Sequence, residues 1–247
     1  MRAPSAAELL DAWERARTEP SALRAAALLT AVSDGESVGA LASASIGERD
    51  RRLLLLREWT FGSALVSVAD CPSCGDRVEW TVRASELRVP IADATASELF
   101  VDVDGYQVRF RLPNSYDLAA ASAADEPVRA RNVLLARCLL SAAIAGQPVN
   151  PRELESLPAK VRDAISARMA EADSHADDSF NLTCPACGHQ WNVLLDIESF
   201  FWSELCVWAE RILEEVHTLA CAYGWRERDI LNMGPWRRHR YLELVGV

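Results

Sequence analysis

The chain carries one motif twice, as Cys71-Pro72-Ser73-Cys74-Gly75 and as Cys184-Pro185-Ala186-Cys187-Gly188. Two cysteines three positions apart can direct both sulfurs toward one metal ion, while the proline stiffens the turn and the glycine permits a positive φ angle. Each motif supplies two ligands, and a structural zinc ion takes four. The sequence therefore predicts a single Zn²⁺ site built from Cys71, Cys74, Cys184 and Cys187, which joins parts of the chain about 110 residues apart.

Strand-like segments flank both motifs, at residues 65–68 and 77–82 and at residues 180–183 and 190–195. This strand–turn–strand layout predicts a zinc ribbon, whereas a thioredoxin-like redox site would place its cysteine pair between a strand and a helix. Two alternatives stay open, namely a pair of disulfide bonds or redox chemistry in the motifs. His189 follows the second motif and could act as a substitute ligand, although a solvent-exposed turn position is the simpler interpretation.

Three further cysteines are scattered through apolar helical segments, at Cys138, Cys206 and Cys221. Isolated cysteines of this kind are typical of small core residues. The total of seven cysteines is odd, which fits poorly with a disulfide framework and predicts a reducing compartment. A site closed by four thiolates also leaves no open position for a catalytic water, so the predicted zinc ion is structural.

The composition limits the class of protein. Half of the 247 residues are hydrophobic, so the chain can bury a substantial core. No apolar run approaches the ~20 residues that span a bilayer, and residues 1–10 lack the apolar stretch of a signal peptide. The net charge of −10, or about −12 with zinc on four thiolates, disfavours binding to nucleic-acid phosphates. The basic residues are nearly all arginine, with Lys160 as the only lysine, which suggests a bacterial source. Together with the missing signal peptide, this predicts a protein of the bacterial cytoplasm.

Helical periodicity covers most of the chain. Caps and apolar spacing predict N-terminal helices at residues 6–17, 21–32 and 48–61. Further helices are predicted at residues 116–122, 126–145, 158–171, 197–223, 227–233 and 235–244. In the longest of these, the predicted buried stripe consists of Trp202, Cys206, Ala209, Leu213, Val216, Ala220 and Tyr223. Asn150-Pro151 is typical of a helix start, and residues 172–179 are typical of a flexible link.

A β-hairpin is predicted at residues 99–112, where apolar and charged residues alternate around an Asp104-Gly105 turn. The predicted fold class is therefore α+β, mostly helical, with a small antiparallel sheet and the four-cysteine zinc ribbon. We expect three regions. These are a helical region at 1–62, a zinc-ribbon and hairpin core at 63–196 with helices inserted at about 114–172, and a C-terminal helical arm at 197–247.

Several segments together resemble one protein family. At the front they are residues 7–14, Phe61-Gly62, the first cysteine motif and Phe110-Arg111-Leu112-Pro113; in the tail they are His217-Thr218-Leu219-Ala220, Tyr223-Gly224-Trp225, Asp229-Ile230-Leu231 and residues 237–242. This combination resembles T4-type baseplate hub assembly chaperones and related baseplate proteins of phage tails and contractile injection systems. The resemblance implies a role in building a baseplate or hub. The partners that it implies are baseplate, hub or tape-measure proteins.

The tail also supplies the candidate partner-binding residues, which are Trp225, Trp236, Arg237, Arg238, Arg240 and Tyr241. Tryptophan and arginine are enriched at interface hot spots. The competing interpretation is that Trp225 packs internally with Ile230 and Leu231, while the arginines are solvated or paired with the acidic body.

The sequence contains none of the enzyme motifs that we searched for, namely a Gly-rich phosphate loop, HExxH and GxSxG. The sequence therefore predicts a non-enzymatic assembly factor or minor baseplate component that takes no small-molecule substrate and can be incorporated into the particle. The alternatives are a zinc-ribbon protein that binds nucleic acid or acts in transcription, and a redox protein.

Overall fold

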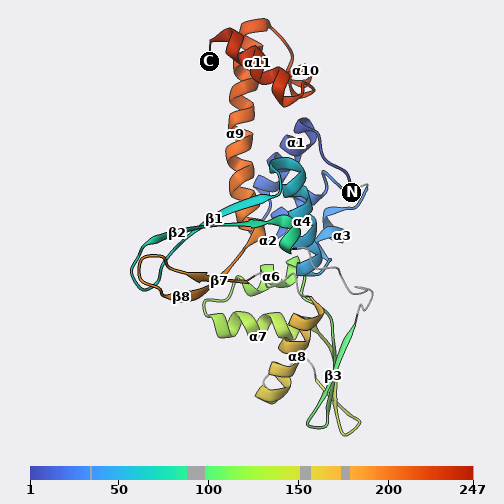
Figure 1. The fold of residues 1–247 in the computed structure, drawn as a ribbon. Coiled ribbons are helices and arrows are strands. Elements are labelled where there is room, and N and C mark those ends of the chain that lie inside the picture. The colour runs from blue at the N-terminus through green and yellow to red at the C-terminus, as the bar shows by residue number, and fades with distance from the viewer. Residues whose placement is uncertain (34, 88–97, 151–156, 174–178, 247) are drawn as a thin grey trace.

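The computed structural model describes residues 1–33, 35–87, 98–150, 157–173 and 179–246. Within these residues the chain is mostly helical, with small antiparallel sheets (Figure 1). The predicted α+β class is confirmed. The sequence predicted one small antiparallel sheet, whereas the described residues form two separate hairpins and a four-stranded sheet. None of the helices described is both long and apolar enough to cross a bilayer.

The N-terminal helices are α1 (Ala6–Thr18), α2 (Ser21–Leu29), α3 (Val38–Ala42) and α4 (Ile46–Phe61). Serine side chains cap three of them, at Ser5 of α1, Ser37 of α3 and Ser45 of α4. Ser5 and Glu8 form a capping box at α1. At α4 the Ser45 hydroxyl accepts a hydrogen bond of 3.2 Å from the Glu48 N–H, so this helix begins two residues before its predicted start.

Two hairpins carry the cysteine motifs. They are formed by β1 (Ala64–Asp70) with β2 (Arg77–Arg83) and by β7 (Ser179–Thr183) with β8 (Gln190–Leu194), and a short helix α5 (Ala84–Leu87) follows β2. Both hairpins project sideways from the helical body and meet at their turns (Figure 1). The strand–turn–strand arrangement predicted around each motif is therefore confirmed.

A second core lies below the hairpins in Figure 1. Its sheet has the order β3 (Leu99–Val103), β4 (Tyr106–Phe110), β5 (Leu139–Ile144) and β6 (Gln147–Val149), and it is accompanied by α6 (Ser115–Ala121), α7 (Pro127–Cys138) and α8 (Ala159–Ala172). The predicted turn between β3 and β4 is confirmed, because Asp104 and Gly105 adopt positive φ angles of 53° and 79°. Pro151 and residues 174–178 lie outside the described residues, so the predicted helix start and link are not placed.

The prediction of one helix over residues 126–145 is wrong. The helix α7 ends at Cys138, and the next six residues form β5, which pairs with β4. The Arg111 backbone N–H donates to the carbonyl of Cys138 over 3.0 Å, and its guanidinium donates to the carbonyl of Arg137 over 3.1 Å. These long-range bonds satisfy the last helical carbonyls, and pairing in the sheet outweighs the helix propensity of the alanines in β5.

The chain ends in α9 (Ile197–Tyr223), α10 (Glu227–Leu231) and α11 (Pro235–Val245). The lower part of α9 packs against the N-terminal helices, while α10 and α11 fold back beside its far end (Figure 1). The predicted stripe of α9 is confirmed in part, since Ala209 and Val216 are buried and Trp202, Cys206 and Ala220 pack against the core, but it is wrong at Leu213 and Tyr223, which are exposed. The buried residues are Ile197, Phe201, Leu205, Ala209, Ile212, Val216 and Leu219.

A buried arginine fixes α9 beside the root of the first hairpin. The guanidinium of Arg57, on α4, donates to both carboxylate oxygens of Glu204 over 2.9 and 2.8 Å. It also donates over 2.6 Å to the carbonyl of Gly62, which lies two residues before β1. A bidentate ion pair fixes the relative orientation of its two side chains as well as their distance. Arg57 therefore holds α4, α9 and the segment before β1 in fixed positions relative to one another.

Candidate metal centre

The two cysteine motifs fold into the same turn. In the first, the Cys71 N–H donates to the Asp76 carbonyl and the Gly75 N–H donates to the Cys71 carbonyl, each over 2.8 Å. The second repeats both bonds over 2.9 Å, from Cys184 to His189 and from Gly188 to Cys184. The two glycines have φ angles of 76° and 74°, which a side chain would strain. The repeated glycine is thus explained by the turn itself.

The four cysteine sulfurs form one compact group. All four Sγ atoms lie within 4.8 Å of one another, with Cys71 and Cys187 separated by 3.7 Å and Cys74 and Cys184 by 3.6 Å. Tetrahedral zinc with Zn–S distances near 2.3 Å places its sulfurs about 3.8 Å apart. All four cysteines are free, and their separations far exceed the ~2.05 Å of a disulfide bond. The donor set and its spacing therefore fit a four-coordinate metal ion.

The electrostatics of the group also favour a cation. Burial opposes ionisation of Cys71, but hydrogen bonds from the N–H groups of Cys74 and Ser73 lower its pKa to about 7. At Cys74 the Asp76 N–H favours the thiolate, yet the Cys187 sulfur and burial together raise the pKa to about 12. Sulfurs this close resist ionising together, because like charges repel. A divalent ion bound to all four removes that repulsion.

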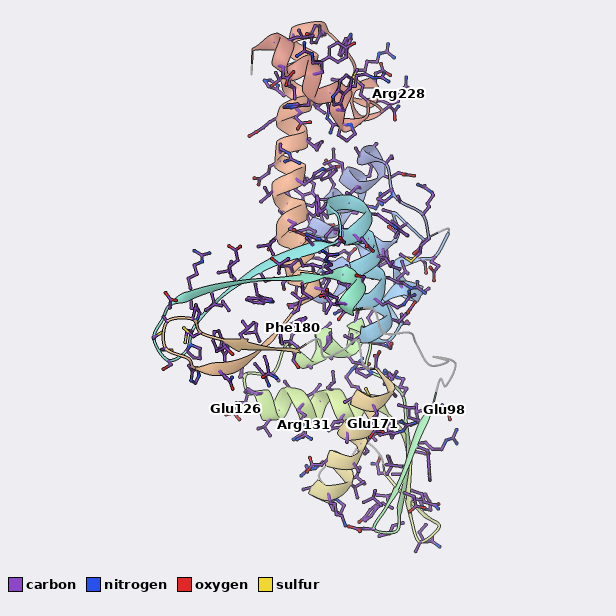
Figure 2. The ribbon with its side chains drawn as sticks, in the orientation of Figure 1. Glu98, Glu126, Arg131, Glu171, Phe180 and Arg228 are labelled. Atoms are coloured by element: carbon purple, nitrogen blue, oxygen red, sulfur yellow. The ribbon has the colours of Figure 1, made fainter. Side chains whose placement is uncertain are left out.

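The surroundings of the sulfurs form a small core of their own. Cys71 and Cys184 are buried with Val78, and Trp191 packs against them, while Cys74 and Cys187 are exposed. In Figure 2 the sulfur atoms gather where the two hairpins meet, whereas Phe180 lies at the root of the second hairpin. His189 is not among the clustered ligands, and its ring stacks on Trp191 with centroids 6.1 Å apart.

The structure separates the candidate partner-binding residues into two groups. Trp236, Arg237 and Arg240 are exposed on α11. Arg238 is buried, with 5% of its surface exposed, and donates to Glu215 of α9 over 2.5 Å. Because adjacent positions on a helix point in different directions, this arginine faces the protein while its neighbours face solvent.

The other two candidates pack together. The Trp225 ring stacks on Tyr223 with centroids 4.5 Å apart, and Tyr241 meets Trp225 edge to face at 4.8 Å. Leu244 was missed by the sequence analysis, although it is exposed and lies eight residues after Trp236 on the same helix. That helical spacing is the signal that could have identified it.

Residues 18–202 match the family described as T4 bacteriophage base plate protein. The chain belongs to the T4 baseplate family. The matched segment of this baseplate protein contains both hairpins and all four clustered cysteines, and it ends within α9. The resemblance to baseplate proteins is therefore confirmed. No curated protein and no solved structure matched the chain.

Proposed function

We propose that this baseplate protein is a non-enzymatic assembly factor, or a minor structural part, of the baseplate or hub of a contractile tail-like particle. The observation that carries the proposal is the family match, which spans three quarters of the chain and includes the whole cysteine cluster. Phage tails and contractile injection systems are the particles concerned. Assembly takes place in the bacterial cytoplasm, and the partners are baseplate, hub or tape-measure proteins.

The proposed metal is one structural Zn²⁺ ion, held by Cys71, Cys74, Cys184 and Cys187 in a zinc ribbon. Four sulfur ligands close the coordination shell, so the ion supplies folding energy and geometry. Its position at the hairpin turns means that it joins two structures that otherwise begin separately on the helical body. Zinc therefore determines how the two hairpins lie relative to each other.

The proposed partner-binding part is the C-terminal arm. A helix of 27 residues is ~40 Å long, so α9 carries α10 and α11 well away from the hairpins (Figure 1). Trp236, Arg237 and Arg240 contact the partner from the exposed side of α11. Trp225, Arg238 and Tyr241 act indirectly, because they hold this end of the arm in shape.

Deleting the gene in a strain that produces the particles tests the proposal. We expect sheaths and tubes without completed baseplates, seen by electron microscopy, and restoration by the full-length chain. Normal particles in the deletion strain would overturn the proposed function. Mass spectrometry of purified particles then separates a resident part, which is retained, from a transient assembly factor, which is lost.

The nucleic-acid alternative is tested on the purified chain. Exposed arginines lie at the end of the arm, on α10 and α11, but the chain as a whole carries −10. We expect no DNA binding at physiological salt. Micromolar binding that weakens steeply with added salt would favour the alternative.

A further inference from the structure

The exposed side of α11 carries a row of three side chains, Trp236, Arg240 and Leu244, which we call the Trp–Arg–Leu ridge. Trp236 and Leu244 are 79% and 62% exposed, and the Arg240 side chain is 58% exposed. Positions four apart lie one above another on a helix, so the ridge extends for roughly 12 Å. Among the large hydrophobic side chains that the structure describes, Trp236 is the most exposed, and Leu244 adds a second apolar side chain on the same line of the helix.

The opposite side of the same helix is anchored. Arg238 is paired with Glu215 and also donates to the carbonyl of Met233 over 3.3 Å. Leu242 is buried in the main core, and Tyr241 packs against Trp225. The ridge is therefore presented on a fixed helix, and docking on it costs little ordering of the protein itself.

The charges around the ridge favour an acidic partner. Arg237 is exposed beside it, and Arg240 lies within it. The only carboxylate of α11, Glu243, accepts from Arg240 over 2.6 Å and lies 3.3 Å from His239. Arg238 is buried and paired with Glu215, and Arg240 is paired with Glu243, so Arg237 carries the positive charge that no ion pair described on this surface offsets. A partner with apolar side chains alone would leave the exposed guanidinium of Arg237 without a matching charge.

We propose that the Trp–Arg–Leu ridge docks an acidic amphipathic helix of a partner protein. Apolar side chains of that helix cover Trp236 and Leu244, and its carboxylates pair with Arg237 and Arg240 in the manner of helix-to-helix recognition. The inference rests on the proposed function only in taking the partner from among the proteins of the tail particle.

Other occupants fit the ridge less well. A second copy docked ridge to ridge about a two-fold axis would bring Arg240 close to its own equivalent. A bilayer would receive only two apolar side chains, and the phosphates of a nucleic acid would leave Leu244 without an apolar partner. An acidic helix is the occupant that satisfies both the apolar and the charged parts of the surface.

The test uses the full-length chain and an array of overlapping peptides from the hub, baseplate and tape-measure proteins of the producing gene cluster. We expect binding to peptides in which acidic residues accompany apolar residues at helical spacing. Trp236→Ser and Arg240→Glu should each weaken that binding at least tenfold. Because both side chains are exposed, the far-UV circular dichroism of these variants should equal that of the parent.

Two control variants alter equally exposed residues of a distant helix. Val128 on α7 is 70% exposed, and Arg131 on the same helix is labelled in Figure 2, far from the Arg228 end of the arm. Val128→Ser and Arg131→Glu should leave peptide binding unchanged. A carboxylate-to-lysine change in the bound peptide should restore binding to the Arg240→Glu variant, which a merely structural effect would not do.

Several results would overturn the inference: no acidic peptide is bound, the ridge variants bind as the parent does, or the purified chain forms a Trp236-dependent dimer in sedimentation. Complementation distinguishes this failure from failure of the proposed function. If a Trp236→Ser, Arg240→Glu double variant fully restores particles to the deletion strain, the docking role of the ridge is refuted while the proposed assembly function stands. Normal particles in the deletion strain itself refute the assembly role.

Discussion

Gly47 and Asp173 meet at a contact that only glycine permits. The Gly47 N–H donates a hydrogen bond of 2.9 Å to Oδ2 of Asp173, and a Cβ atom at Gly47 would lie 1.8 Å from Oδ1. Gly47 belongs to the first turn of α4, and Asp173 follows the end of α8. The carboxylate thus satisfies a free N–H at a helix N-terminus, where negative charge is favoured, and joins the two cores of the molecule.

Gly47→Ala should therefore destabilise the protein, even though alanine is the better helix former. We expect a loss of about 1–3 kcal/mol in the free energy of unfolding, because the buried hydrogen bond breaks and Asp173 must move. Urea denaturation measures this loss.

Gly39 on α3 provides the matched control. A Cβ atom there would meet its nearest neighbour, the Tyr116 hydroxyl, at an ordinary 3.6 Å, so Gly39→Ala should be neutral or stabilising. In an Asp173→Ala background, Gly47→Ala should lose most of its cost. An equal penalty in both backgrounds would contradict the proposed contact.

Removing one ligand from the metal centre should have a large effect. Cys71→Ser or Cys184→Ser is expected to abolish stoichiometric zinc and to lower the melting temperature by ten degrees or more, on the order expected when a structural site loses its binding free energy. Metal analysis of chelator-free protein and differential scanning calorimetry check both parts. Strong chelators should reproduce the effect in the parent.

Cys221→Ser is the control for these variants, because Cys221 is exposed on α9 and lies outside the cluster. It should bind zinc and melt as the parent does. Parent protein that contains no zinc and has its clustered cysteines oxidised to disulfides would contradict the metal centre.

The start of α9 should make stability depend on pH. Burial raises the pKa of Glu198 to about 7, against the attraction of Arg49, and the nearby carboxylates of Asp196 and Asp50 add to the rise. The folded chain therefore holds this proton more tightly than the unfolded chain, whose carboxyl titrates near 4.5. The resulting stabilisation is present below pH 4.5 and is lost as pH rises to about 7.

Relative to Glu198→Gln, the parent should thus lose up to about 3 kcal/mol of unfolding free energy between pH 4.5 and pH 8. Urea denaturation of both proteins across this range measures the difference. Arg49, which lies 2.9 Å from Glu198 and 2.7 Å from Asp50, limits the loss by stabilising the ionised form. A difference that stays constant with pH would refute the prediction.

Two adjacent arginines should behave differently on substitution. Arg238→Ala removes the buried partner of Glu215 and should cost about 2–4 kcal/mol of unfolding free energy. Arg237→Ala alters an exposed side chain of the same helix and should change stability by less than about 0.5 kcal/mol. If both substitutions lower the free energy of unfolding by the same amount in chemical denaturation, the assignment of Arg238 to the core and Arg237 to the surface is wrong.

Features encoded by local sequence were predicted well. Helix ends followed from caps such as Ser5, and the hairpin at Asp104-Gly105 followed from its turn residues, because both depend on neighbours a few positions away. The cysteine cluster was predicted because the chemistry of zinc requires four ligands, which the sequence offers in two matching pairs.

Features that depend on distant partners were not predicted well. Residues 139–144 become a strand because β4 lies beside them, and nothing within the segment reveals this. The buried face of α9 was misplaced at Leu213, because Leu213 and Ile212 differ by one position and are equally apolar. Only the packing of other helices against α9 decides between them.

The separation of the two cysteine motifs along the chain sets an order of events in folding. Cys71 and Cys187 lie 116 residues apart, and their sulfurs end 3.7 Å from each other. At a bacterial synthesis rate of about 5–20 residues per second, the first pair of thiols waits on the order of 6–20 s for the second. Closing so long a loop is slow and entropically costly, so the helices and the second core have time to form first. Uptake of the proposed zinc ion would therefore mark a chain that has already been synthesised past Cys187.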